Sequence, residues 1–141
     1  MHSAYKIIAH IISAFVVIQA AVITWAVFIL IGELISGQVP TGPPIGAILH
    51  GVFGQYVIPV LAVVLLVVAL VGRAGVKWAA LAVGLVLLQI ALAYAAFAAP
   101  IVGILHAINA FAIMAMAEIG ARAVSRVDPG RPAEARVRPA T

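Results

Sequence analysis

Long apolar runs broken by single polar residues dominate the chain from about residue 7 to residue 124. There are four such runs, and each is long enough for an α-helix to cross the hydrocarbon core of a bilayer, which takes about twenty residues. Turn-forming or basic residues separate them, namely the Pro- and Gly-rich segment 36–44, the basic segment 73–77 and Pro100. The pattern predicts four membrane-spanning helices, over about residues 5–35, 45–72, 77–99 and 101–124.

The composition supports a membrane protein. Hydrophobic residues make up 66% of the 141 positions and charged residues 9%, with a mean hydropathy of +1.27, whereas soluble domains are about half apolar and a quarter charged. The absence of Cys excludes disulfides, iron–sulfur clusters and covalent haem attachment. We expect an all-α integral membrane four-helix bundle over residues 1–125, which crosses the plasma membrane several times, and an Arg- and Pro-rich cytoplasmic tail over 126–141.

The basic residues predict the orientation of the bundle. Four spans would place all eight of them on one side of the membrane, before the first helix, around the link between the second and third helices, and after the fourth: Lys6, Arg73, Lys77, Arg122, Arg126, Arg131, Arg136 and Arg138. Because cytoplasmic segments are enriched in Lys and Arg, both termini are expected to be cytoplasmic. The cations flank helices and form no groove with aromatic residues, so we expect no nucleic-acid partner.

An internal repeat links the second and fourth helices. The first begins Pro44-Ile-Gly-Ala-Ile-Leu-His50 and the other Pro100-Ile-Val-Gly-Ile-Leu-His106, with five of seven positions identical. The chain therefore resembles two tandem helical hairpins related by an axis along the membrane normal. In such a bundle the second and fourth helices lie diagonally opposite, and both histidines lie at one depth, about 9 Å from the outer helix ends at 1.5 Å per residue.

Two facing intramembrane histidines favour axial ligation of one haem b per chain, with His50 and His106 as the iron ligands. Neighbouring small residues would let the flat porphyrin approach the helix backbones, and Asn109, one turn from His106, would brace a ligand or contact a substrate. The candidate cofactor-binding residues are therefore His50, His106, Gly46, Gly54, Gly103 and Asn109. The alternative interpretation is a duplicated structural His, with Gly and Ala allowing close helix packing. A bare Zn or Cu ion would lack enough ligands in this set.

Other polar residues within the spans have simpler interpretations. Gln19, Gln89 and Asn109 are expected to form hydrogen bonds between helices. Pro59 is expected to kink the second helix, because it cannot donate a hydrogen bond to the carbonyl of Gln55. His10, the other histidine within a predicted span, has no counterpart in the repeat, so we interpret it as a residue of the membrane interface.

The arrangement of these residues resembles an uncharacterised, actinobacterial-type bacterial family of four-span membrane proteins of unknown function. The resemblance extends to about residue 126 and rests on the run His50-Gly-Val-Phe-Gly, a Pro in the second helix, Gln89, Pro100, Gly103, Leu105-His106, Asn109-Ala110 and Ala121-Arg122. More distantly, the layout is similar to one four-helix half of haem A synthase, which has a His on its second and fourth helices. That resemblance implies haem ligation by His50 and His106. Ala47 stands where the catalytic half has a Glu, so the resemblance implies a bound haem rather than oxidation of a haem methyl group.

The function expected from these features is that of a small membrane b-type cytochrome, serving electron transfer or haem handling near the outer leaflet. Compatible partners, besides the lipid bilayer, are a quinone, a redox partner protein or a larger membrane complex. Two alternatives come from other classes of protein: a non-redox structural or assembly subunit of a larger membrane complex, and a small transporter.

Overall fold

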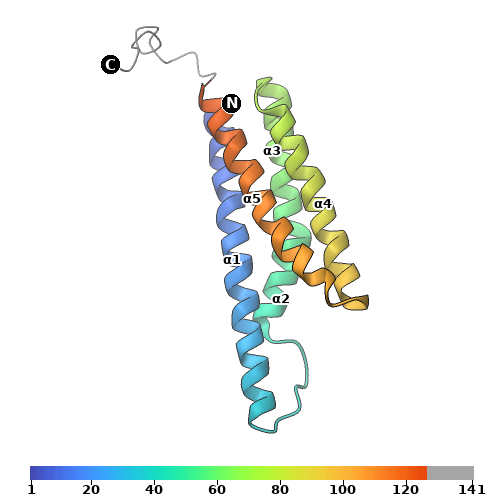
Figure 1. Ribbon diagram of the computed structural model, residues 1–141. Coiled ribbons are helices and arrows are strands. Elements are labelled where there is room, and N and C mark those ends of the chain that lie inside the picture. The colour runs from blue at the N-terminus through green and yellow to red at the C-terminus, as the bar shows by residue number, and fades with distance from the viewer. Residues whose placement is uncertain (127–141) are drawn as a thin grey trace, which may run out of the picture.

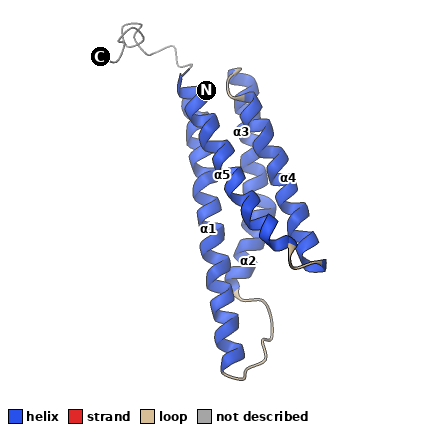
Figure 2. Ribbon diagram, viewed as in Figure 1, coloured by secondary structure: helices blue, strands red, loops and turns tan. Residues whose placement is uncertain are grey.

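The protein is described by a computed structural model over residues 1–126, in which helices are joined by short connections (Figure 1). Figure 2 shows helix and loop over this range and no strand. Four stretches are long and apolar enough to cross a membrane, as predicted, so the chain has the helices of a multi-pass membrane protein. The elements are α1 (His2–Ile35), α2 (Ile45–Val52), the π-helical turn η1 (Phe53–Val57), α3 (Ile58–Gly72), α4 (Val76–Ala98) and α5 (Val102–Arg126).

The helix ends lie close to their predicted positions. The largest difference is at α1, which begins at His2 rather than near residue 5. The short link between α3 and α4 turns through two residues with positive φ, Arg73 at 49° and Gly75 at 72°. Ala99 adopts an extended conformation before Pro100, as residues that precede proline usually do. Apart from Arg126, the predicted tail lies outside the described residues.

The second span is interrupted by a π-helical turn just before Pro59. The ring of Pro59 has no N–H for the carbonyl of Gln55, where an α-helix would form a hydrogen bond. The turn η1 covers Phe53–Val57 and joins α2 to α3 within one continuous span. Single π-helical turns of this kind are frequent at functional sites. The predicted kink at Pro59 stays a prediction, and what the structure has next to the proline is this π turn.

Contacts between helices define the bundle. α1 packs against α2, α3 and α5, and α4 packs against α3 and α5, whereas α2 and α5 do not pack along one another. The start of α1, the link between α3 and α4 and the end of α5 lie at the same end of the bundle (Figure 1). There the Tyr5 hydroxyl donates a hydrogen bond to the carbonyl of Gly75 at 3.3 Å. We call this end of the molecule the terminal end.

The buried core occupies the half of the bundle nearest the terminal end. Four helices contribute to it: Tyr5, Ala9, Ile12 and Val16 from α1, Ile58, Ala62, Leu65 and Ala69 from α3, Ala79 and Val86 from α4, and Ile113, Ala117, Ala121 and Val124 from α5. Beyond the level of Gln19 and Asn109, the buried residues of the described chain are Ala26 and Gly46. The opposite half of the bundle, which we call the distal half, therefore lacks a packed core between its helices.

Candidate functional site

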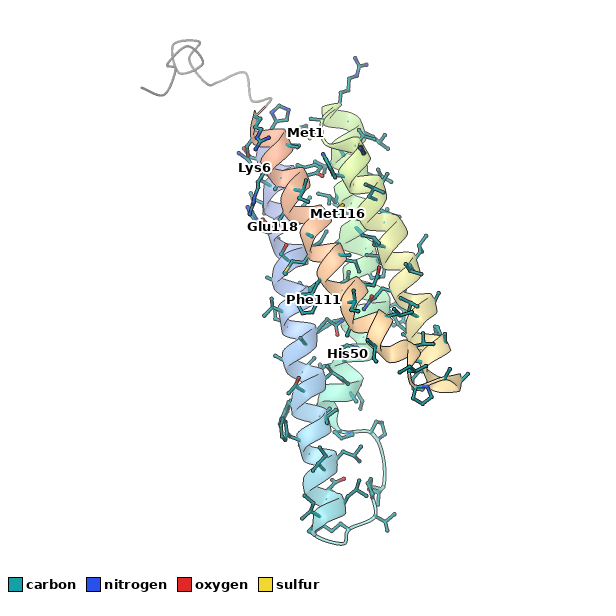
Figure 3. The ribbon with its side chains drawn as sticks, viewed as in Figure 1. Met1, Lys6, His50, Phe111, Met116 and Glu118 are labelled. Carbon is teal, nitrogen blue, oxygen red and sulfur yellow. The ribbon has the colours of Figure 1, made fainter. Side chains whose placement is uncertain are left out.

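His50 of α2 and His106 of α5 lie side by side where the packed core ends. Their ring centroids are 6.2 Å apart and their planes are inclined by 58°. Both side chains are half-buried, and Figure 3 marks His50 beside the distal part of α5. The two helices do not pack along one another, so the imidazoles approach across the interior of the bundle. The sequence repeat predicts that these two residues meet, and the structure brings them together.

Each imidazole is held by a backbone carbonyl of the helix that precedes its own. Nδ1 of His50 lies 3.1 Å from the carbonyl oxygen of Gln19 in α1. Nδ1 of His106 lies 3.1 Å from the carbonyl oxygen of Gln89 in α4. A carbonyl oxygen only accepts hydrogen bonds, so Nδ1 carries the proton in both rings. In the neutral imidazole, Nε2 then keeps its lone pair, which is the arrangement that metal-binding histidines commonly have.

The two Nε2 atoms differ in their surroundings. Nε2 of His106 accepts a hydrogen bond from the side-chain amide of Gln89 at 3.1 Å. The Gln89 amide oxygen in turn accepts a hydrogen bond from Asn109 at 2.7 Å, and Asn109 also donates to the carbonyl of Leu85 at 2.8 Å. Nε2 of His50 makes no hydrogen bond to any residue in the described range 1–126. The lone pair of His50 is therefore free, and that of His106 is shared with a neighbouring amide.

Gln19 departs from the expected bonding between helices. Its side chain is 93% buried, since 7% of its surface is exposed, yet neither its amide nitrogen nor its amide oxygen has a hydrogen-bond partner. Only its backbone carbonyl is used, by His50. Gln89 and Asn109 form the predicted bonds between α4 and α5. An unpaired buried amide costs about 1–3 kcal/mol. The Gln19 amide can therefore still donate and accept hydrogen bonds on the α1 side of the site.

The three candidate glycines have different surroundings. A Cβ atom added to Gly46 would clash with the Val22 carbonyl oxygen and approach Ala26, so Gly46 packs tightly on α1. A Cβ on Gly54 would lie 3.1 Å from the amide nitrogen of Gln19. A Cβ on Gly103 would meet only Ala96, at 3.9 Å. Close helix packing explains Gly46 without any ligand, and the Gln19 amide lies close against Gly54, whereas Gly103 has only an ordinary contact with Ala96.

A second polar cluster joins α1 and α5 nearer the terminal end. Oε1 of Glu118 lies 3.0 Å from Nδ1 of His10 and accepts a hydrogen bond from the Ser13 hydroxyl at 2.7 Å. Figure 3 shows Glu118 close to α1, between Lys6 and the middle of the bundle. The sequence predicts an interfacial position for His10 but not its contact with Glu118. The available signal was that both residues lie one helical turn from a basic residue, Lys6 and Arg122.

The side chains of the site limit the cofactors that they can hold. Within residues 1–126 no group of three or more His, Asp or Glu side chains is arranged to bind a bare metal ion. A haem makes smaller demands, because the porphyrin supplies four nitrogen ligands and the protein supplies one or two axial ones. The histidine pair fits that requirement in ligand type and in the proton position at Nδ1. The comparisons found no protein-family model, curated protein or solved structure that matches the chain, so both family resemblances stay predictions.

Proposed function

We propose that the protein is a small membrane b-type cytochrome in which His50 and His106 hold one haem b. The spacing of the two rings is the observation on which the proposal rests. An iron bonded to two imidazole nitrogens at about 2.0 Å each, with about 1.1 Å from each nitrogen to its ring centre, requires centroids roughly 6 Å apart. The observed separation is 6.2 Å. His50 and His106 would hold the haem, which would supply reversible one-electron transfer.

The hydrogen bonds at Nδ1 support this proposal. Donation to the carbonyls of Gln19 and Gln89 fixes the ring orientations and directs the proton away from Nε2. Hydrogen bonds of this kind orient metal-binding histidines and raise their basicity. His50 offers a free Nε2, whereas His106 requires the Gln89 amide to release its Nε2. The hydrogen bond from Asn109 would hold the other end of that amide in place.

The loose packing of the distal half also supports the proposal. The core residues stop at the level of the histidine pair, and Ala26 and Gly46 bury each other between α1 and α2 rather than filling the interior. Gly103, where an added Cβ atom would meet only Ala96 at 3.9 Å, would leave room for a flat macrocycle. The buried amide of Gln19 beside Gly54 is a hydrogen-bond donor and acceptor without a protein partner, and a ligand or a water can use it.

The orientation that we infer places this site toward the outer leaflet. The basic residues of the described chain lie at the terminal end or within about one turn of it: Lys6, Arg73, Lys77, Arg122 and Arg126. By the positive-inside rule that end is cytoplasmic, and the two tandem hairpins then carry the histidines toward the opposite surface. Electron transfer or haem handling there suits a quinone, a redox protein or a larger membrane complex as the partner.

One alternative is a non-redox structural or assembly subunit, and a specific observation favours it. The bonds from His50 to Gln19 and from His106 to Gln89 each join two helices. Such bonds stabilise helix pairs in membranes without any cofactor. In that case the imidazoles would serve only as cross-links, and the protein would fold equally well without haem.

A reduced-minus-oxidised absorption spectrum tests the proposal. The protein would be produced in membranes supplied with haem, purified in detergent and reduced with dithionite. We expect a sharp α band, one haem per chain, and loss of both in His50→Ala and in His106→Ala. His10→Ala is the matched control, because it removes a histidine of α1 outside the pair and should keep the band. A colourless wild-type protein with full helical content would overturn the proposal and favour the structural subunit.

A further inference from the structure

Cationic side chains surround one tryptophan at the terminal end, on the side where α4 and α5 meet. Arg122 and Arg126 lie one turn apart on α5, and Lys77 is the second residue of α4. The Lys77 Nζ atom lies 5.2 Å from the centre of the Trp78 ring, within the range of a cation–π contact. A groove of about 250 Å³ opens between the two helices, lined by Trp78, Ile119, Arg122, Ala123 and Arg126.

A glycine explains why α4 and α5 pack closely beside this groove. A Cβ atom added to Gly120 would lie 2.9 Å from the Cβ of Trp78, so the glycine lets α4 approach α5 closely at that point. Residues four apart share one side of a helix, which places Arg122 and Arg126 along the same edge of the groove. Ile119 and Ala123 repeat the spacing three positions earlier and form an apolar wall. The groove is thus basic at its rim and apolar along one side.

Within residues 1–126 the positive charge of the groove is offset only in part, by the Glu118 carboxylate near Arg122. Neither Arg122 nor Arg126 forms an ion pair with a residue in that range. Glu118 lies one turn from Arg122, but its carboxylate is bonded to His10 and Ser13 on α1. The two guanidinium groups therefore keep their donors available for an anion from outside the described chain.

We propose that this groove binds the phosphate headgroup of an anionic phospholipid, with one acyl chain along Ile119 and Ala123. Guanidinium groups bind phosphate oxygens through paired hydrogen bonds. Tryptophan is enriched at the depth of the lipid headgroups, and basic pockets between spanning helices bind anionic headgroups. The site is distinct from the histidine pair and does not depend on haem binding.

Native mass spectrometry of the full chain tests this inference. The protein in detergent is titrated with phosphatidylglycerol or with phosphatidylcholine of the same acyl chains. We expect the first lipid to bind at least ten-fold more tightly. The double variant Arg122→Gln/Arg126→Gln should lose about five-fold in affinity for each Arg removed. The matched control Arg136→Gln/Arg138→Gln removes the same charge outside the described residues and should change the affinity less than two-fold.

Three outcomes would overturn the inference. These are equal binding of both lipids, equal losses in the two double variants, and displacement of phosphatidylglycerol by millimolar inorganic phosphate, which would identify a free anion as the ligand. A second measurement follows Trp78 directly: in a Trp25→Phe background, its fluorescence should shift with phosphatidylglycerol and stay constant with phosphatidylcholine. Unchanged helical content of each variant shows that the comparison concerns folded protein.

Discussion

The imidazole of His106 is bonded at both of its nitrogens, whereas that of His50 is bonded at one. His106 donates to the Gln89 carbonyl and accepts from the Gln89 amide, and His50 donates to the Gln19 carbonyl alone. The repeat in the sequence gives both rings the same spacing from a proline, but their hydrogen bonds are unequal. This asymmetry allows the structural contribution of each histidine to be measured apart from haem binding.

In the haem-free protein, His106→Ala should destabilise the fold more than His50→Ala. The first substitution removes two hydrogen bonds and leaves the Gln89 amide without its acceptor, whereas the second removes one bond. Hydrogen bonds between membrane helices contribute about 0.6 kcal/mol on average and up to about 1.7 kcal/mol, so we expect the two variants to differ by roughly 1 kcal/mol. Unfolding titrations in mixed micelles measure the difference. Equal losses would contradict the asymmetric hydrogen bonding.

Gln19→Leu and Gln89→Leu should have opposite effects on the free energy of unfolding. The Gln19 amide is buried without partners, so replacing it with an apolar group of similar size should be neutral or stabilise the fold by about 1 kcal/mol. The Gln89 amide bonds His106 and Asn109, so its loss should destabilise the fold by about 1–2 kcal/mol.

The same two variants separate the roles of Gln89 in folding and in haem binding. Removing its amide frees Nε2 of His106, so Gln89→Leu should keep the reduced α band in haem-loaded protein. The backbone carbonyl that orients His106 is unchanged by the substitution. The absorption spectrum is compared with that of Gln19→Leu at equal protein concentration. Loss of the band in folded Gln89→Leu would show that the amide positions the ligand.

Gly46→Ala should weaken the contact between α1 and α2. The added methyl group would clash with the carbonyl oxygen of Val22, and overpacking of this kind costs about 1–3 kcal/mol. Gly84→Ala is the matched control, because no atom lies within 4 Å of the added Cβ on α4. An alanine inside a helix is favoured over glycine by about 0.5–1 kcal/mol, so the control should raise the melting temperature. A higher melting temperature for both variants would contradict the close approach at Gly46.

Glu118→Ala should lower the free energy of unfolding, because it removes the acceptor that joins Ser13 and His10 of α1 to α5. The expected loss is about 1 kcal/mol, the scale of hydrogen bonds between membrane helices. Glu33→Ala is the control, since the Glu33 carboxylate forms no hydrogen bond within residues 1–126. The same micelle titration compares the two variants, and a larger loss in the control would contradict the role of Glu118.

The sequence predicts the features that depend on long apolar runs and on the repeat. The four spans follow from hydrophobicity over more than twenty residues, because every lipid-facing backbone group must be satisfied within a helix. The approach of His50 to His106 follows from the matched Pro-to-His spacing. The spans depend on composition and the approach of the histidines on the helical period, and both can be obtained from the sequence.

Features that depend on the relative rotation of two helices were not predictable in the same way. The hydrogen bond between His10 and Glu118 joins residues 108 positions apart. A single polar residue on each helix does not show that the two face one another. The tight contact of Gly46 with α1 and the unpaired amide of Gln19 depend on sub-ångström placement of neighbouring backbones. The sequence predicts a kink at Pro59, whereas the structure has a π-helical turn over the five residues Phe53–Val57, a form that the proline alone does not specify.

Buried side chains are concentrated near the terminal end, whereas the proposed haem site lies where this packed core ends. Stability is unevenly distributed in proteins, and weakly packed regions open at lower free energy than the core. We therefore expect the helix segments around His50 and His106 to open at a lower free energy than the core around Tyr5, Leu65 and Ile113. A ligand would enter or leave by local separation of the helices, with no need for the whole chain to unfold.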